Sequence, residues 1–285
     1  MKSFAIPLVA LVGWQLLFCG AARTSPAGTK ITLGGTVAAN EQVSMDQISH
    51  APWTELLARY VDKAGLVNYT AWKASPADVK RLDEYLNSLS RARTGARARR
   101  EAQFAFWINA YNAVTIKGIL REYPTTSIRN HTPRLFGYHI WHDLLLQVGG
   151  RTYSLSQIEH DELRKMGDPR IHFAIVCASR GCPRLLDEAY TATELNDQLN
   201  RNARDFFAQK SRFQYDSPAR SIKVSYILDL FARDFGATPA ERMKRIAPYL
   251  PDAASRELAA GGNARVSYLE YDWSLNDQAT EQSGR

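Results

Sequence analysis

Residues 101–122 constrain the fold more than any other segment, because they form one helical stretch that is apolar nearly all round. A helix of that kind is covered by protein on every side, so we expect it to be buried in the middle of the domain. Its polar exceptions Glu101, Asn109 and Asn112 are spaced to share one helix face. An unpaired buried amide costs about 1–3 kcal/mol. The asparagines must therefore meet partners, either loops that they brace or a site that they line.

Around this segment the sequence mixes helical and strand patterns. Ser75 and Pro76 begin a helix as cap and first residue, and the segment 144–154 predicts a hairpin that turns at two glycines. A capping box formed by Ser156 and Glu159 is expected to open a short helix. Further strands are expected at 171–177, 212–215, 221–225 and 266–271, and further helices at 53–60, 227–235, 239–249 and 252–260. The pattern predicts an α+β fold, a helix-rich single domain over 51–276 around a small, largely antiparallel sheet.

The N-terminus has the pattern of a secretory signal peptide over residues 1–22. Lys2 precedes an apolar stretch over 4–18, and small residues follow at 20–22. We therefore expect a periplasmic or secreted protein. Acylation of Cys19 as a lipoprotein is the weaker alternative, because the residue before it is not small.

The rest of the chain has no second segment apolar and long enough to cross a bilayer, so we expect no membrane-spanning part. A flexible leader over 23–50 and a polar tail over 277–285 are expected to flank the domain. The formal net charge of +7 suits an anionic component of the cell envelope as a partner. Arginines gathered at 91–100 have no aromatic residues between them, so we interpret them as a solvated surface and expect no nucleic acid as a partner.

Cys177 ends a predicted strand and opens a loop, a position where reactive residues are often held by a rigid scaffold. A cysteine nucleophile needs a base and a group that orients the base. His160 and His172 are the candidate bases, although an ideal strand would point His172 and Cys177 to opposite faces. The candidate orienting groups are the side chains of Glu101, Asn109 and Glu159.

Three structural alternatives stay open at this point. His172 also fits a hydrogen-bonded core residue, and Cys177 fits a small buried hydrophobe. Cys177 and Cys182 also fit a disulfide that staples the loop, because two close thiols in an oxidising compartment readily bridge.

Four blocks of sequence are distinctive when they occur together, namely FAFWINAYNA at 104–113, YSL and IEH at 153–160, DPRIHFA with Cys177 and Cys182-Pro183 at 168–183, and YDWSLN at 271–276. With these blocks the chain resembles family 547 of the domains of unknown function, DUF547, over a core of 97–215. That family occurs in exported bacterial proteins and in plant proteins. The resemblance implies a distantly papain- or transglutaminase-like arrangement, with Asn109, Glu159, His160, His172 and Cys177 on matching positions. Some relatives have serine in place of Cys182, which implies that a disulfide is not the general reason for Cys177.

The sequence thus leads to three hypotheses. The first is a thiol-dependent hydrolase or acyl transferase on peptide or amide bonds, with Cys177 as nucleophile and loop amides after it holding the oxyanion. The second is a thiol–disulfide redox protein that uses Cys177 and Cys182. The third is a non-enzymatic binding module of the cell envelope. No metal or cofactor is predicted, and the substrate class is a small molecule or a peptide.

Overall fold

The computed structural model describes residues 30–133 and 138–279. The signal peptide expected over 1–22 lies outside the described residues. The helices are α1 Ala51–Tyr60, α2 Tyr69–Lys73, α3 Pro76–Leu89, α4 Arg100–Glu122, α5 Ile140–Asp143, α6 Leu155–Gln157, α7 Leu195–Phe207, α8 Ile227–Leu230, α9 Ala232–Phe235, α10 Pro239–Ile246 and α11 Ala253–Gly261. The strands are β1 Ile31–Leu33, β2 Leu144–Val148, β3 Arg151–Ser154, β4 Phe213–Asp216, β5 Ser221–Ser225 and β6 Arg265–Leu269.

The α+β class is confirmed, and within the described residues the strands form two separate sheets. In the order β1-β2-β3, β1 pairs parallel with β2, and β2 pairs antiparallel with β3. In the order β4-β5-β6, β4 pairs antiparallel with β5, and β5 pairs parallel with β6. Each sheet is therefore mixed rather than largely antiparallel. β1 lies within 23–50, the segment expected to be a flexible leader.

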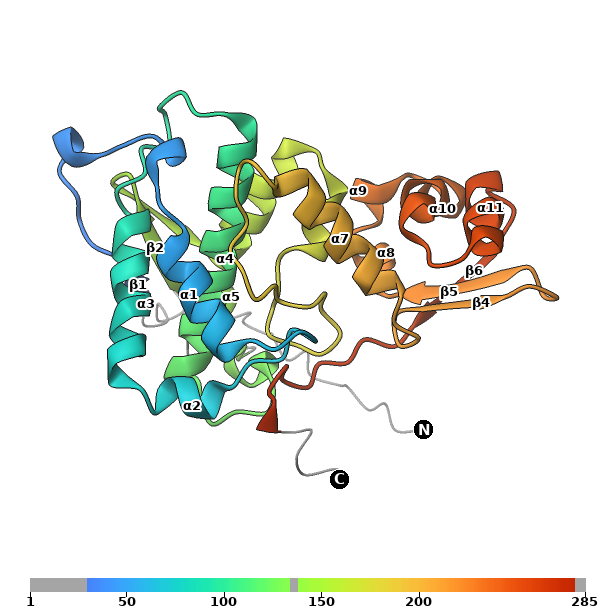
Figure 1. The fold of residues 1–285 in the computed structure, drawn as a ribbon, viewed down its shortest axis with the longest axis horizontal. Coiled ribbons are helices and arrows are strands. Elements are labelled where there is room, and N and C mark those ends of the chain that lie inside the picture. Colours follow the sequence, from blue (N-terminus) through green and yellow to red (C-terminus); the bar gives the residue numbers. More distant parts are fainter. Residues whose placement is uncertain (1–29, 134–137, 280–285) are drawn as a thin grey trace, which may run out of the picture.

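Two hydrophobic clusters underlie the two ends of the molecule in Figure 1. The larger cluster surrounds α4 and includes α1, α3 and β2. The smaller cluster lies between α7, α10 and the sheet of β4, β5 and β6. The segment after β6 then returns to the first end, where Asn276 accepts a hydrogen bond from the hydroxyl of Tyr69 at 2.9 Å.

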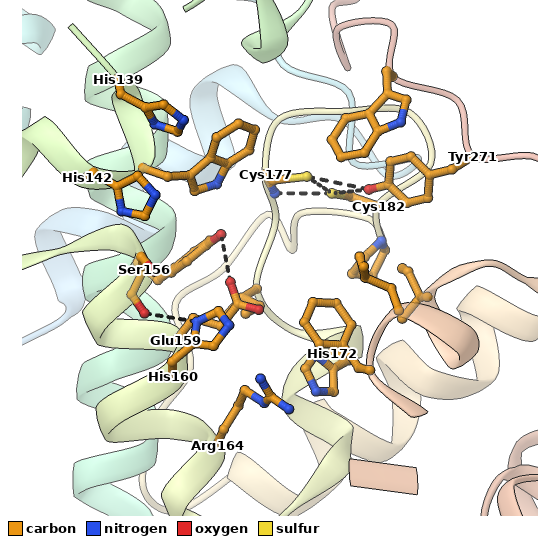
Figure 2. A pocket seen from close by; sticks show the side chains of 18 residues that line it. His139, His142, Ser156, Glu159, His160, Arg164, His172, Cys177, Cys182 and Tyr271 are labelled. Atoms are coloured by element: carbon orange, nitrogen blue, oxygen red, sulfur yellow. Dashed lines mark hydrogen bonds between the residues drawn. The ribbon is translucent and has the colours of Figure 1, made fainter. Parts of the chain in front are cut away.

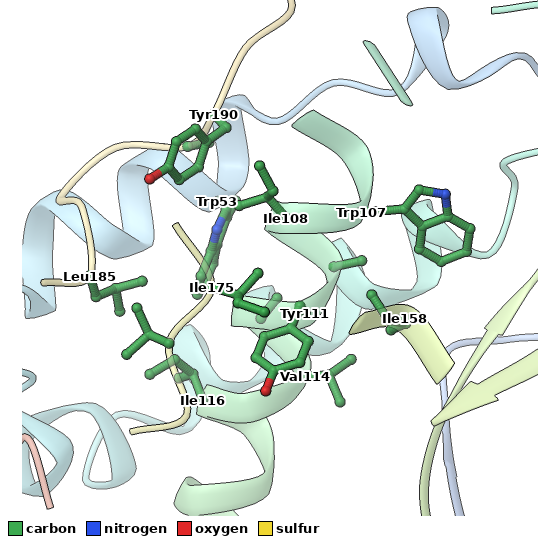
Figure 3. Packing of buried hydrophobic residues seen from close by; sticks show 14 of the residues in the cluster. Trp53, Trp107, Ile108, Tyr111, Val114, Ile116, Ile158, Ile175, Leu185 and Tyr190 are labelled. Carbon is green, nitrogen blue, oxygen red and sulfur yellow. The ribbon is translucent and has the colours of Figure 1, made fainter. Parts of the chain in front are cut away.

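Helix α4 is buried along nearly its whole length, as its all-round apolar pattern predicts. Figure 3 shows its side chains Ile108, Tyr111 and Val114 among Trp53 and Ile158 from neighbouring elements. Truncation of a large buried aliphatic side chain in such a core typically lowers the free energy of unfolding by about 2–5 kcal/mol, and we expect a loss of that order for α4. This helix therefore forms the rigid support for the loops that cross it.

The predicted strand at 171–177 is wrong. Residues Pro169–Phe173 form a 3-10 turn whose first amide is capped, because the carboxylate of Asp168 accepts a hydrogen bond from the N–H of Arg170 at 3.0 Å. The chain then runs extended without a strand neighbour. Its backbone groups bond instead to the side chain of Asn112, at Ala174 O and Val176 N.

The capping box is also shifted from the expected pair. Ser154 and Gln157 form it, with Ser154 Oγ accepting from the N–H of Gln157 and Gln157 Oε1 accepting from the N–H of Ser154. The helix that follows widens into a π-helical turn, Ile158–Leu163. Because Glu159 is not used as a cap, its side chain is free to point into the protein.

Candidate functional site

A cavity of about 380 Å³ lies between the π-helical turn Ile158–Leu163, the loop from 177 to 183 and the segment 271–273. Aromatic and aliphatic side chains form most of its wall, among them Trp141, Phe231 and Trp273. Figure 2 shows Cys177, Cys182 and Tyr271 on one side and Glu159, His160 and His172 on another. Five of the side chains that the sequence singled out therefore line one cavity, namely Cys177, Cys182, Glu159, His160 and His172.

The two cysteines lie in direct contact. Their sulfurs are 2.8 Å apart, and both residues are free thiols. Cys182 is buried, with 3% of its surface exposed, whereas Cys177 is partly exposed. The backbone N–H of Cys177 also donates a hydrogen bond to Cys182 Sγ at 3.1 Å.

Two hydroxyl groups complete the surroundings of the sulfurs. The hydroxyl of Tyr271 lies 3.0 Å from Cys182 Sγ, 3.4 Å from Cys177 Sγ and 2.8 Å from Ser179 Oγ. Ser179 Oγ in turn donates to Cys182 Sγ at 3.3 Å. Cys182 thus accepts hydrogen bonds from several donors, which is the arrangement that favours a thiolate.

These contacts explain an uneven distribution of charge over the pair. Burial opposes ionisation of the Cys182 thiol, but hydrogen bonds from Cys177, Ser179 and Tyr271 outweigh it and lower its pKa to about 6. The hydrogen bond that Cys177 gives to Cys182, together with burial, raises the pKa of Cys177 well above its usual value. At neutral pH the pair therefore holds one proton and one negative charge, with the charge on Cys182.

The segment that follows β6 clamps the cysteine loop. The N–H groups of Arg180 and Gly181 donate to the carbonyls of Ser274 and Asp272, each at 2.8 Å. At Gly181 a β-carbon would lie 2.9 Å from Asp272 O, so a side chain there would push the two segments apart. Ala178 has a φ of 58°, a left-handed conformation that costs energy for a residue other than glycine. Strain of this kind next to Cys177 persists only because the clamp holds the loop.

The two asparagines of α4 brace the backbone. Asn112 donates to Ala174 O at 3.0 Å and accepts from Val176 N at 2.9 Å, which fixes the chain just before Cys177. Asn109 makes the same double contact with the backbone of Tyr190, at 2.8 and 2.9 Å. Glu101 and Asn109 are not among the residues that line the cavity, so neither orients a base there.

The other wall of the cavity carries a chain of charged groups. His172 Nε2 lies 2.7 Å from Asp234 Oδ2, and Arg164 makes two hydrogen bonds to the same carboxylate at 2.6 and 2.8 Å. Burial lowers the pKa of His172 despite this carboxylate. Although burial alone would raise the pKa of Asp234, its bonds to His172 and Arg164 lower it. His172 Nε2 is thus bound to a carboxylate, while burial of the ring disfavours its charged form.

Glu159 and His160 differ in burial. Glu159 is buried, which raises the pKa of its carboxyl, and its nearest hydrogen-bond donor is the hydroxyl of Tyr111 at 3.4 Å. His160 is exposed, and its Nδ1 lies 3.0 Å from Ser156 O, which leaves Nε2 toward solvent or the cavity. In the described part of the chain, neither His160 nor His172 makes a hydrogen bond to a sulfur of the pair.

Several residues of this site were not assigned a role from sequence. Tyr271 lies in the last of the four sequence blocks, so its position was noticeable but its contact with the thiols was not. Ser179, Arg164 and Asp234 come from a loop and two helical segments whose approach depends on the tertiary fold. Nothing in their local sequence distinguishes them from surface residues.

Residues 30–133 and 138–279 contain neither a candidate metal site nor a candidate membrane-spanning helix. No group of three or more His, Cys, Asp or Glu side chains is placed there to hold a metal ion. Over the same residues, the helices are too short or too polar to traverse a bilayer.

The cavity and its thiol pair define an α+β protein with two adjacent free cysteines, one buried and one partly exposed, at a pocket wall. Residues 96–207 match the family model of DUF547, described as a protein of unknown function, which confirms the resemblance found in the sequence. No curated protein and no solved structure matches the chain significantly.

Proposed function

We propose that this protein is an exported thiol–disulfide exchange protein and that Cys177 and Cys182 are its redox pair. One observation carries the proposal, namely two free thiols with sulfurs 2.8 Å apart at the wall of a cavity. A pair so placed is able to close to a disulfide with little movement of the loop. Export to an oxidising compartment, which the N-terminal sequence leads us to expect, is where such chemistry operates.

The exposure of the two thiols assigns their order of reaction. Cys177 is the accessible thiol, so it attacks a disulfide of the partner while its proton passes to the Cys182 thiolate. A Cys177–partner disulfide forms, and one partner sulfur leaves as a thiolate. Cys182 then gives up that proton and attacks Cys177 Sγ, which closes the Cys177–Cys182 disulfide and releases the second partner sulfur. Two electrons pass to the partner, whose two sulfurs leave with the pair's proton and one from solvent.

Acyl transfer by Cys177 has less support from the geometry. The N–H groups of Cys177, Arg180, Gly181 and Cys182 already donate to acceptors within the described part of the protein, so of the loop 177–182 only those of Ala178 and Ser179 are left for an oxyanion. Asp234 binds His172 Nε2 as the acid of a triad would, but neither cavity histidine is hydrogen-bonded to a sulfur in the described residues. A cysteine hydrolase needs a base beside its thiol as well as free N–H donors for the oxyanion.

The test is equilibration of the purified protein, without residues 1–22, against glutathione redox buffers. We expect a reversible dithiol–disulfide transition, read by mass after thiol alkylation. C182S should trap glutathione as a stable mixed disulfide on Cys177, because the resolving thiol is missing. C177S should react more slowly, because Cys182 is buried.

Two results would contradict the proposal. One is a pair that stays fully reduced, or fully oxidised, across the whole range of buffers, which would indicate inert thiols or a structural staple. The other is turnover of an ester or amide substrate by C182S but not by C177S, which would favour acyl transfer.

A further inference from the structure

A second cavity, of about 430 Å³, lies on the other side of the cysteine loop. Cys182 and Tyr271 line both cavities, so they form part of the partition between them. The second cavity is lined by three arginines, Arg180, Arg184 and Arg212. Of these, Arg212 is the most unusual in its surroundings.

Arg212 is a buried cation whose hydrogen-bonding capacity is largely unused. Only 8% of its surface is exposed. Its Nη2 donates to Arg180 O at 2.9 Å, and its guanidinium lies 5.0 Å from the ring centre of Phe206. Nε and Nη1 are buried with no hydrogen-bond partner in the described part of the chain.

The charge of Arg212 also lacks a carboxylate partner. Arg184, by contrast, forms an ion pair with Asp205 at 2.7 Å. Glu270 and Asp272 line the same cavity, but among the described residues no carboxylate oxygen forms an ion pair with Arg212. An uncompensated buried cation costs several kcal/mol. A nearby anion that is not a carboxylate would offset this cost for Arg212.

Cys182 and Tyr271 are the two ionisable groups close enough for a negative charge on them to act on Arg212. Tyr271 keeps its proton, because burial and the neighbouring thiols raise the pKa of its hydroxyl well above the usual value. Cys182 is then the one of the two that is ionised near neutral pH. Its thiolate also accepts hydrogen bonds from Cys177 and Ser179, which hold it in place beside the cavity wall.

We propose that Arg212 is the counter-ion of the Cys182 thiolate and that it thereby makes the Cys177–Cys182 pair more oxidising. A buried cation favours the reduced pair, which carries a negative charge, over the disulfide, which carries none. Stabilisation of the reduced form is what makes a disulfide a stronger oxidant. The redox consequence rests on the proposed exchange function, whereas the stabilisation of the thiolate does not. Arg212 is a positioning residue in this scheme, since it touches no reacting atom.

The experiment compares the ultraviolet absorbance of the thiolate against pH in the reduced wild type and in R212M, R212Q, R212K and R184M. In R212M we expect the pKa of the first thiol to rise by about one unit, which leaves about tenfold less thiolate at a pH below it. At a pH above the pKa of this thiol in the wild type and in R212M, where the thiolate is the main form, this tenfold loss of stabilisation makes the reduction potential about 30 mV more negative. R212K keeps the charge and should titrate close to the wild type.

R184M is the matched control, because it removes a cation from the same cavity whose charge Asp205 already balances. It should leave the thiolate titration unchanged. The inference is overturned if R212M folds and its first thiol has the wild-type pKa, or if that pKa shifts equally in R184M. A shifted titration without any exchange activity would keep the counter-ion and refute the proposed function.

R212Q provides a second neutral variant, since its amide is able to donate to Arg180 O. If neither neutral variant folds, C182A decides the question by removing the anion instead. The cation is then uncompensated, so C182A should lose more stability against the wild type at about pH 8 than at about pH 5, where the thiolate is protonated. An equal loss at both pH values overturns the inference.

Discussion

The two walls of the first cavity differ in how their polar groups are satisfied. On the thiol wall, formed by the loop 177–182 and Tyr271, the side chains of Cys177, Ser179, Cys182 and Tyr271 bond to one another. On the opposite wall, which we call the carboxyl wall and define by Glu159, His160, Arg164 and His172, Glu159 Oε1 and His172 Nδ1 are buried with no partner within the described residues.

We interpret this difference as a division of roles between the thiol wall, where we propose the reaction, and the carboxyl wall. The thiol wall is preorganised, because its loop is clamped by the segment after β6 and its sulfurs are held by fixed donors. Each unpaired atom of the carboxyl wall costs about 1–3 kcal/mol. A partner that offers polar atoms there would recover that energy, so we interpret the carboxyl wall as the side that binds. The π-helical turn supports this interpretation, since such turns occur frequently at functional sites.

The largest expected effect concerns Asn112 of α4, which holds the backbone just before the thiol wall. N112A would leave Ala174 O and Val176 N buried without a partner. We expect the free energy of unfolding to fall by about 3 kcal/mol, measured by denaturant titration. N87A, at an exposed position of α3, is the control and should change it by less than about 0.5 kcal/mol. A loss in N112A no larger than in N87A would show that the thiol wall does not depend on α4.

The next effect tests the carboxyl wall through pH. Burial raises the folded-state pKa of Glu159 above its unfolded value, so its contribution to stability is full below the unfolded pKa. That contribution is lost as pH rises through the folded pKa. E159Q cannot ionise, so it should gain about 1 kcal/mol or more relative to the wild type between about pH 4 and pH 7, measured by denaturant titration.

Asp161, exposed on the same π-helical turn, supplies the control for this measurement. D161N removes a carboxyl of the same turn without releasing a buried charge, and its stability relative to the wild type should change little over the same pH range. If the stabilities of E159Q and D161N relative to the wild type changed with pH in the same way, burial would not disfavour ionisation of Glu159.

The smallest expected effect concerns one donor of the thiol wall. Y271F removes the hydroxyl that contacts Ser179 and both sulfurs. The remaining donors still hold the thiolate, so we expect the pKa of the first thiol to rise by only about half a unit, which corresponds to about 0.7 kcal/mol. The pH dependence of alkylation by iodoacetamide measures it. Y268F removes a hydroxyl that bonds to Arg242, and an equal shift there would refute a specific role for Tyr271.

Much of the local structure was predictable because it depends on neighbours in sequence. Ser75 caps α3 as expected, and the two glycines at 149–150 turn the hairpin of β2 and β3. The strand predicted at 171–177 failed for a tertiary reason. Its apolar run matches a buried strand, but the partner of its backbone is the side chain of Asn112, about sixty residues earlier in the sequence.

Several residues of the candidate site could be predicted from the sequence, but the contacts among them could not. The residue types at 159, 160, 172, 177 and 182 marked a polar set that the fold brings to one cavity. The contacts among them were not predictable. His172 binds Asp234, and the neighbour of Cys177 is Cys182 rather than the expected histidine. Asp234 lies 62 positions from His172, and no local pattern connects them.

By itself, the sequence determined the buried central helix, the α+β class, the resemblance of residues 96–207 to DUF547 and the loop that carries two cysteines, because hydrophobic periodicity, caps, turns and motifs are local properties. Only the tertiary structure decided which cysteine carries the charge. The hydroxyl of Tyr271 reaches Cys182 from a segment distant in sequence, as does the charge of Arg212 in our proposal. Ionisation depends on the distances to such groups and on burial, and both exist only once the chain has folded.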